Sequence, residues 1–520
     1  MSTRRSPNGI ERPASASRCR RSCSTPSRPD SDERLVGCAI LTAHFYAAPV
    51  GEAEHSPRRK AVILAACCLG VLIAAMDGTI VNVAIPSIRD DLGASAASMQ
   101  WVVAAYALTM AAVLLLSGAA GDRYGRKRIF LTGLTTFALG SLMCSLAGSV
   151  GVLVGSRAIQ AVGASMLNTI AMAIVVQVFP GRVERARAIG IWGSVIGLGL
   201  ALGPVLGGTL TDLVSWRAVF WINIPICLAA IVLTIVFVPE SMSRRPTAFD
   251  PAGQLLGAAT IFGVVFVLIE APGRGATSGA VVGVATMALG AAIAFLTVEA
   301  RHRTPFIDLR LFRRPLFCSA IGIAVCSFAL YGGFLFVMSH YLQDERGLSA
   351  IRAGLCFLPM AAAAALGSPV AGHLIGRWGT RTPLLVSGFA FTGAAASLML
   401  LEPDTPMWSL ALSFAVFGIG FGMVNAPVTA LAVTALPADR SGTAAALATT
   451  SRQVGLAIGV ALCGPLAGDA LTHTAEFATA THPLWAVFVL LGLTIVVLAL
   501  LPSRAGLERG GAELPVATTR

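Results

Sequence analysis

Long apolar segments recur between residues 61 and 501, and they limit the possible folds of this chain more than any other feature. A helix needs about 20 consecutive apolar residues to cross the hydrocarbon core of a bilayer. The chain is 55% hydrophobic and 12% charged, whereas a soluble domain carries roughly 25% charged residues. The sequence therefore predicts an all-α membrane protein with about fourteen transmembrane helices.

The predicted spans form two groups of six with a pair between them. The first six are 61–83, 101–120, 129–147, 152–178, 189–210 and 219–238. The pair is 252–269 and 280–298, and the last six are 316–338, 353–374, 384–401, 409–435, 443–466 and 484–501. This pattern divides the chain into a disordered basic tail (1–60), a six-helix bundle (61–240), an inserted helix pair (250–300), a second six-helix bundle (314–502) and a C-terminal tail (503–520).

Lysine and arginine are divided unequally between the loops of the two sides. If the N-terminus is inside, the inner loops hold 22 of these residues and the outer loops hold 5. Because cytoplasmic loops carry the excess of Lys and Arg, both termini are predicted to be cytoplasmic. The same loops account for much of the net charge of +12, so this charge does not indicate a nucleic-acid partner.

One loop motif occurs after the second span of each half. Residues 118–127 read GAAGDRYGRK, and residues 372–381 read GHLIGRWGTR. The repeat indicates two parallel halves, which is a transporter architecture with the binding site between the halves. We interpret the first copy as a cytoplasmic gating loop in which an acid and basic residues link helix ends: Gly118, Asp122, Arg123, Gly125 and Arg126.

Two charged residues lie inside predicted spans. Asp77 is 16 residues from the inner start of its span, about 24 Å at 1.5 Å per residue. Arg157 is 5 residues from the outer start of its span, so both lie in the outer half of a core about 30 Å thick. A carboxylate there costs roughly 2.5–3.5 kcal/mol unless it has a partner or a cavity. We predict a proton-coupling and substrate site at Asp77, Arg157 and the nearby Gln160; the alternative is two side chains that reach separately toward the interface.

The fifth span carries small residues at helical spacing. Gly199, Gly203 and Gly207 share one face, and Pro204 and Gly208 lie between and after them. Such a face lets another backbone approach closely, while proline loosens the helix. A gating role and ordinary tight packing are both compatible with this pattern.

Arg452 and Gln453 lie near the middle of the thirteenth span. They either line the substrate cavity or contact a neighbouring helix, and the sequence does not decide between these two roles.

The sequence lacks the motifs of several other functions. Its only lysines are Lys60 and Lys127, and neither belongs to a nucleotide-binding loop. The 11 cysteines show no metal-ligand spacing. We therefore expect neither an enzyme nor a nucleotide-driven pump, and we expect no metal and no cofactor.

Taken together, these motifs resemble the major facilitator superfamily and, more narrowly, the fourteen-span drug:proton antiporters of bacteria. The resemblance covers roughly residues 61 to 501. It rests on the segments 76–86, 118–128, 157–163, 199–208, 216–225 and 341–343. Two departures are Ala161, where the fourth-span motif usually has glycine, and Gly376, which replaces the acid in the second loop copy.

The resemblance implies a proton-driven exporter of amphipathic, often cationic, drugs or antibiotics in the bacterial inner (plasma) membrane. It implies that Asp77 and Arg157 take part in proton coupling and drug handling, with protons as the coupling ion. Two alternatives remain: a secondary importer of a small organic solute on the same fold, and a membrane sensor or lipid-handling protein without coupled transport.

The predicted orientation can be tested by labelling introduced cysteines. Single cysteines that replace Arg123 and Arg377 should resist a membrane-impermeant maleimide in intact cells and react in everted vesicles, because both loops are predicted to be cytoplasmic. A cysteine that replaces Arg274, in a predicted outer loop, is the control and should react in intact cells. External labelling of either loop would overturn the predicted topology.

Overall fold

The computed structural model describes residues 56–242, 250–302, 309–402, 404–434, 441–467 and 477–501, and every regular element in these ranges is a helix. The predicted C-terminal tail and most of the predicted N-terminal tail lie outside them. The first helix begins at Pro57, four residues before the predicted first span at 61–83. Ser56 caps this helix by accepting a hydrogen bond from the Arg59 amide, and proline at the first helical position has no amide to satisfy.

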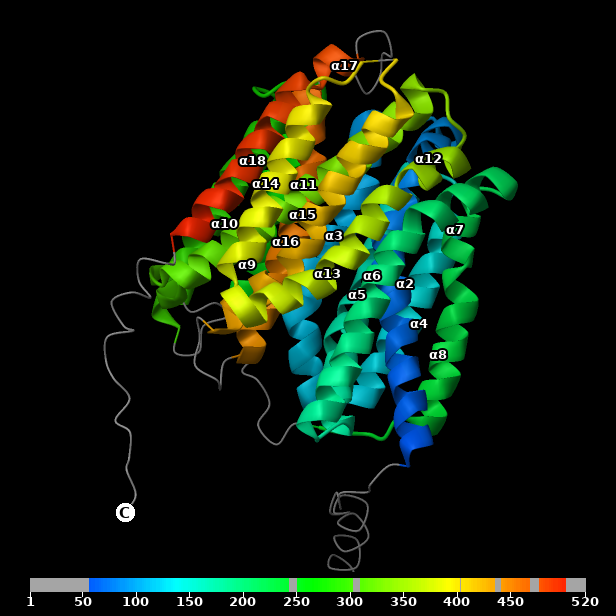
Figure 1. The fold of residues 1–520 in the computed structure, drawn as a ribbon, viewed down its shortest axis with the longest axis vertical. Coiled ribbons are helices and arrows are strands. Elements are labelled where there is room, and N and C mark those ends of the chain that lie inside the picture. The colour runs from blue at the N-terminus through cyan, green and yellow to red at the C-terminus, as the bar shows by residue number, and fades with distance from the viewer. Residues whose placement is uncertain are drawn as a thin grey trace, which may run out of the picture. The chain divides into compact units, whose positions relative to one another are not determined.

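The N-terminal half and the inserted pair follow one another along the chain (Figure 1). The half comprises α2 (Pro57–Leu92), α3 (Ala96–Tyr124), α4 (Arg126–Ser145), α5 (Val150–Val178), α6 (Arg182–Leu213), α7 (Ala218–Trp221) and α8 (Asn223–Phe237). The inserted pair is α9 (Pro251–Arg274) and α10 (Gly279–Arg301).

The C-terminal half contains longer helices interrupted by short turns. It comprises η1 (Leu309–Arg313), α11 (Pro315–His340), η2 (Tyr341–Glu345), α12 (Ala350–Cys356), α13 (Leu358–Trp378), α14 (Arg381–Leu398), α15 (Met407–Thr434), α16 (Ser441–Ala467), α17 (Phe477–Ala480) and α18 (His482–Leu500).

Thirteen helical segments of the described chain are long and apolar enough to cross a membrane. The short helices α7 and α12 count together with α8 and α13, because each pair forms one apolar segment. The remaining predicted span, 384–401, corresponds to α14, an 18-residue helix that packs between α15 and α18. The predicted all-α membrane fold with about fourteen spans is therefore confirmed.

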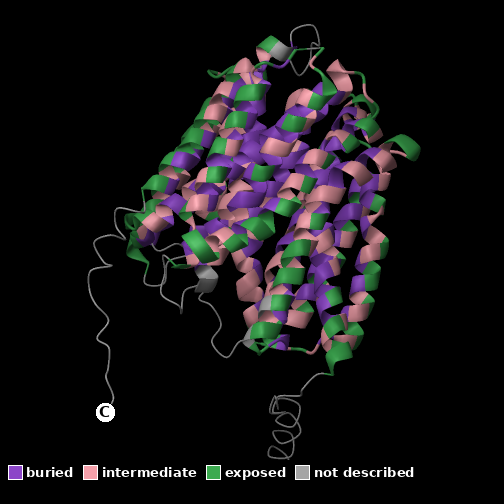
Figure 2. Cartoon of the chain, viewed as in Figure 1, coloured by how far each residue is buried: buried purple, intermediate pink, exposed green. Residues whose placement is uncertain are grey.

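Burial distinguishes central helices from peripheral ones. In the most apolar stretch of each candidate span, 83% of the residues are buried for Pro315–Glu345 (α11 and η2) but only 11% for α10. Buried residues gather in the middle of the bundle, and exposed residues are common along its outer helices (Figure 2). Large apolar side chains on the outside, such as Leu255 and Leu289, are 71% and 62% exposed. An apolar exterior of this kind is suited to lipid rather than to water.

The inserted helix α9 packs against one helix from each half, α3 and α16. The Trp101 indole nitrogen donates a hydrogen bond of 2.8 Å to Glu270, and the Gln254 amide donates to the Ala112 carbonyl. Trp101 also packs against Phe262, with ring centroids 5.4 Å apart. The polar contacts of the pair thus go to α3, while apolar packing joins α9 to α16 as well.

We call the end of the bundle where α2 begins and α3 ends the basic end, and the other end the opposite end. At the opposite end the two halves are joined. Arg89 on α2 forms a bidentate ion pair with Asp344 on η2, with N–O distances of 2.9 and 3.1 Å. The Gln343 amide donates to the Val83 carbonyl at 3.0 Å. Asp212 on α6 caps α12 by accepting hydrogen bonds from the first two amides of that helix, at 3.1 and 2.8 Å.

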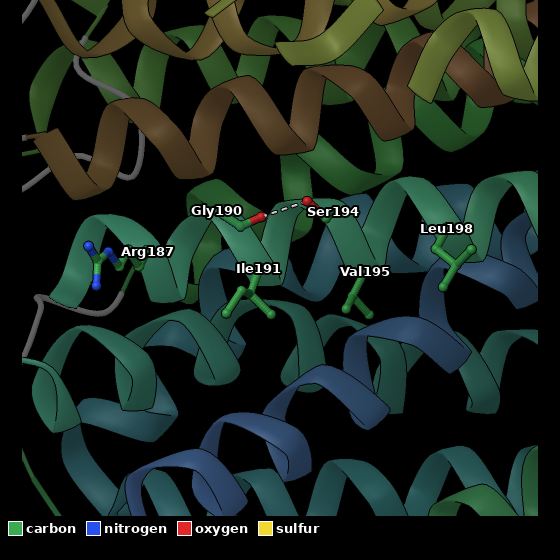
Figure 3. A pocket seen from close by; sticks show the side chains of 6 residues that line it. All are labelled: Arg187, Gly190, Ile191, Ser194, Val195 and Leu198. Carbon is green, nitrogen blue, oxygen red and sulfur yellow. Dashed lines mark hydrogen bonds between the residues drawn. The ribbon is translucent and has the colours of Figure 1, made fainter. Parts of the chain in front are cut away.

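Toward the basic end, α6 lines an open cavity of about 520 Å³ (Figure 3). The lining residues are Arg187, Gly190, Ile191, Ser194, Val195 and Leu198. Gly190 and Gly208 are 18 residues apart, which is about five turns, so they lie on the same face of the helix. At Gly208 this face presses on the α12 backbone. The two halves are thus joined at the opposite end, and α6 lines an open depression nearer the basic end.

The ion pair between Arg89 and Asp344 should stabilise closure of the opposite end. Arg89→Ala should shift the population toward separated halves, because a partly exposed pair worth about 1 kcal/mol changes a two-state ratio about fivefold. Spin labels at Val214 and Leu400, which are 71% and 79% exposed, should report longer distances by pulsed electron paramagnetic resonance.

Arg217→Ala is the matched control, because Arg217 pairs with Asp91 at 2.8 Å within the N-terminal half. An unchanged distance distribution in Arg89→Ala, or an equal shift in both variants, would contradict a closing role for the pair.

Candidate functional site

A fully buried ion pair lies at the centre of the N-terminal half. Asp77 on α2 is 0% exposed and Arg157 on α5 is 1% exposed. Arg157 Nη1 donates to Asp77 Oδ2 and also, at 2.6 Å, to Oε1 of Gln160. Arg157 and Gln160 lie one helical turn apart on α5, so both reach the same carboxylate. The structure brings together the three residues of the predicted coupling site.

Amide donors hold the second oxygen of the carboxylate. Gln160 Nε2 donates to Asp77 Oδ1 at 2.8 Å, and Asn223 Nδ2 donates to the same oxygen at 3.1 Å. Both amides also donate to the Ser141 hydroxyl oxygen, at 2.7 and 3.3 Å. A buried charge is stable only when a counterion and hydrogen bonds replace water. Here α2, α4, α5 and α8 supply these groups jointly.

Aromatic rings and a backbone carbonyl surround the Arg157 guanidinium. Its Cζ lies 4.2 Å from the centroid of the Tyr106 ring and 5.8 Å from that of Phe220. Arg157 Nε donates to the Val102 carbonyl at 3.3 Å. Cation–π contacts are strongest where the cation has lost its water. The guanidinium is therefore held in one position from several sides.

The sequence reasoning did not assign Asn223, Ser141 and Tyr106 to this cluster. Asn223 lies in the segment 216–225 that contributed to the family resemblance. The sequence therefore marked this residue as part of a motif but did not indicate its role. Its Oδ1 is buried and has no hydrogen-bond partner. Ser141 and Tyr106 carry no charge and belong to no quoted motif, so nothing in one sequence singles them out.

The small residues of α6 separate into two contact faces. A side chain at Gly199, Gly203 or Gly207 would collide with α2, against the stretch from Leu72 to Ile80 that contains Asp77. Gly208 presses on the Ala350 carbonyl of α12, and the Pro204 carbonyl lies against Gly354. α6 thus touches the backbone next to the ion pair on one face and the C-terminal half on another.

The first copy of the loop motif joins α3 to α4. Arg126 Nη2 donates to Asp122 Oδ1 at 3.1 Å, and Arg126 Nη1 donates to Gln177 Oε1 on α5 at 3.1 Å. Gly118 lies close to Thr169 on α5. Arg123 is exposed and stacks on the Tyr124 ring at 5.7 Å. The predicted acid–base link between helix ends is present, with Asp122 and Arg126 as its members.

A carboxylate outside the motif completes this loop. Glu240 accepts a hydrogen bond from the Lys127 amide at 3.1 Å and lies 3.6 Å from Arg128. Gly125 has φ +105°, and a side chain there would collide with the Glu240 carboxylate. Glycine is therefore needed at this position for both conformation and space.

The second loop copy has the same glycine turn as the first copy but lacks its acidic residue. Gly379 has φ +75°, as its counterpart Gly125 also has a positive φ. Gly376 stands in the place of the acid, and Arg377 is exposed. The two halves therefore share a turn, whereas the acid–base link occurs in the first copy.

Arg452 and Gln453 lie on α16 in the C-terminal half, outside the Asp77 cluster. Arg452 contacts α15 and the Phe328 ring of α11. Within the described residues, no group of three or more His, Cys, Asp or Glu side chains could hold a metal ion.

Comparison with known proteins identifies the family. The family model of the Major Facilitator Superfamily matches residues 67–460. The multidrug resistance protein Stp of Mycobacterium tuberculosis is 36% identical over 421 residues, covering 81% of this chain and 78% of that protein. The tetracenomycin C resistance and export protein of Streptomyces glaucescens is 35% identical, covering 78% and 75%.

The fold has a counterpart among solved structures. A crystal structure of the peptide transporter POT in complex with sulfate superposes with a TM-score of 0.64 at 17% identity, covering 87% of this chain and 96% of that chain. At this identity the likeness concerns the fold alone. The family match, the efflux relatives and the transporter fold agree that this multi-pass membrane chain belongs to the Major Facilitator Superfamily.

Proposed function

We propose that this chain is a proton-coupled exporter that moves amphipathic drugs or antibiotics out of a bacterial cell and takes up protons in exchange. In this proposal it lies in the plasma membrane with its basic end and both termini in the cytoplasm. Its relatives include proteins named for multidrug resistance and for tetracenomycin C export, which supports drug efflux. Protons serve as the coupling ion, and no other cofactor is needed.

The buried pair of Asp77 and Arg157 is the observation that carries the proposal. A proton bound to the carboxylate cancels its charge and leaves Arg157 without a counterion in a water-poor interior. An uncompensated buried charge is costly, so the cluster must rearrange when Asp77 is protonated. One proton can therefore shift the balance between two conformations.

The α6 packing suggests how this shift reaches the other half. Gly203 and Gly207 lie against the α2 backbone one turn after Asp77, and Gly208 lies against α12. A movement of α2 at the protonation site would displace α6, because the Thr79 hydroxyl donates a hydrogen bond to the Leu200 carbonyl of α6 and the Ile80 backbone lies directly against Gly207. α6 in turn contacts the C-terminal half at the closed end of the bundle.

Asp77→Asn should abolish proton-driven export. The amide has nearly the same size and can still form hydrogen bonds, but it cannot take up a proton and it leaves Arg157 unpaired. Everted vesicles that carry wild-type protein should accumulate a fluorescent amphipathic dye until a protonophore is added, and the variant should show background accumulation only.

Asp404→Asn, the same change at an exposed position, should behave as wild type. Because Asp77→Asn alone could destabilise the fold, the double variant Asp77→Asn/Arg157→Gln removes both charges and should remain membrane-inserted without coupling. Protonophore-sensitive accumulation by the inserted double variant would show that the pair does not couple transport. Proton-driven dye movement in the opposite direction would indicate an importer.

Substitutions of Arg157 should show whether coupling needs only a positive charge or also the geometry of the guanidinium. Its guanidinium donates through two separate nitrogens to Asp77, Gln160 and the Val102 carbonyl. An ammonium group cannot reproduce that fork. We therefore expect Arg157→Ala to uncouple dye movement from the pH gradient and Arg157→Lys to restore coupling only partly. The measurement is dye accumulation as a function of the imposed pH difference; full coupling in Arg157→Lys would show that positive charge alone is sufficient.

A further inference from the structure

An arginine, Arg452, lies deep inside the C-terminal half, whereas the proposed proton site lies in the N-terminal half. Arg452 follows Ser441, the first residue of α16, by 11 residues and precedes Ala467, the last, by 15. At 1.5 Å per residue, these distances are about 16 and 23 Å along the helix. A guanidinium this far from either end of the helix cannot easily reach an interface, so its position needs an explanation.

Neutral groups hold this guanidinium in place. Arg452 Nη2 donates to the Asn425 carbonyl at 3.0 Å and to the Thr429 hydroxyl at 2.6 Å, both on α15. The Phe328 ring of α11 lies 5.8 Å from Cζ. Arg452 forms no ion pair with any residue that the structure describes. Its positive charge therefore lacks the counterion that Arg157 has.

The remaining donors of Arg452 make no hydrogen bond to the described chain, and the residue is partly exposed. A guanidinium has five N–H donors, and both hydrogen bonds of Arg452 to the described chain use Nη2. Nε and Nη1 are not among the fully buried atoms that lack a partner, so they have accessible surface. Hydrocarbon cannot solvate these groups, and charged side chains within a membrane face a cavity or the bundle interior. α16 packs on α3 of the N-terminal half as well as on α11 and α15 of its own half, so Arg452 lies on a helix where the two halves meet.

Aromatic side chains adjoin the guanidinium. Phe328 on α11 packs against Phe421 on α15, with centroids 5.4 Å apart, and Tyr331 stacks on the same Phe421 ring at 4.1 Å. Phe328 is itself partly exposed. Small-molecule sites combine apolar walls with a few placed polar groups. Tyr331 and Phe421 are buried and support Phe328 from behind, so the partly exposed Phe328 ring is the surface that suits a flat aromatic ring. The Nε and Nη1 donors beside it suit an acceptor oxygen.

The charges within the spans favour an anion. In the N-terminal half, Asp77 is already neutralised by Arg157. Other ion pairs in the described spans lie near helix ends, such as Arg89 with Asp344 and Arg274 with Glu270. No acidic side chain among the described residues pairs with Arg452. A cationic ligand beside it would be repelled, whereas a carboxylate or phenolate would complete a charge-assisted hydrogen bond.

We propose that Arg452, together with Phe328 and the Phe421 and Tyr331 rings behind it, forms the subsite that binds the carboxylate or phenolate group of an aromatic substrate. This inference rests on the proposed export function and narrows it. The exported molecules are aromatic carboxylates or phenolates rather than the cations that the family resemblance implies.

Equilibrium binding to the purified full-length protein tests this subsite directly. The two probes are fluorescein, an anionic xanthene, and tetramethylrhodamine ethyl ester, a cationic xanthene of similar shape, each followed by fluorescence polarisation. Wild type should bind fluorescein more tightly. Arg452→Gln should weaken fluorescein binding about tenfold or more, the scale of one lost hydrogen bond to a charged group. Binding of the cationic ester should be unchanged or tighter.

Two further variants separate binding from a structural role. Arg352→Gln removes an exposed arginine on α12 and should leave both affinities unchanged. Arg452→Lys keeps the charge and should retain part of the preference for fluorescein. Equal weakening of both probes in Arg452→Gln, or equal wild-type affinity for both probes, would overturn the subsite and leave Arg452 as a brace between α15 and α16.

The failure of this inference can be distinguished from failure of the proposed function, because binding in detergent needs no proton gradient. Arg452-dependent binding of fluorescein without protonophore-sensitive movement in vesicles would refute coupled export and leave the subsite standing. Coupled export with fluorescein affinity independent of Arg452 would refute the subsite alone.

Discussion

The ion pair between Asp77 and Arg157 is the constraint on which the N-terminal half depends. Neither charge is tolerable alone in a water-poor interior, so α2 and α5 must meet where the two side chains lie. The remaining hydrogen-bonding capacity of the carboxylate is then met by Gln160 and Asn223, and Ser141 joins these two amides. One buried charge thus determines how four helices are arranged around it.

The packing of α6 extends this constraint beyond the polar cluster. Glycines at 199, 203 and 207 bring its backbone against α2, and Gly208 brings another face against α12. A continuous packed route therefore runs from the carboxylate to the C-terminal half. The ion pair of Arg89 and Asp344 and the cap that Asp212 provides lie at the end of that route, where the halves meet.

Much of this arrangement is predictable from sequence, because a charged residue within an apolar segment is energetically costly and is easily recognised. A charge within an apolar run demands a partner, and equal depth identified Arg157 as the partner of Asp77. Neutral residues give no such signal: Ser141, Tyr106 and Asn223 are common residue types in membrane helices, and their contacts join segments up to 146 residues apart. The sequence gives no signal for Glu240, because this residue follows the sixth span and lies outside the loop motif that it contacts. The α2 helix extends before the apolar segment because its Ser56 cap and Pro57 start do not require apolar residues.

The two sets of buried polar groups lie in different halves of the molecule. The carboxylate cluster lies wholly between residues 77 and 223, whereas the Arg452 subsite lies between residues 328 and 452. Because the two sets share no residue, a substitution in one of them need not alter the other. On the roles proposed above, substitutions on α11, α15 and α16 would change which compounds are accepted and leave the Asp77 cluster intact.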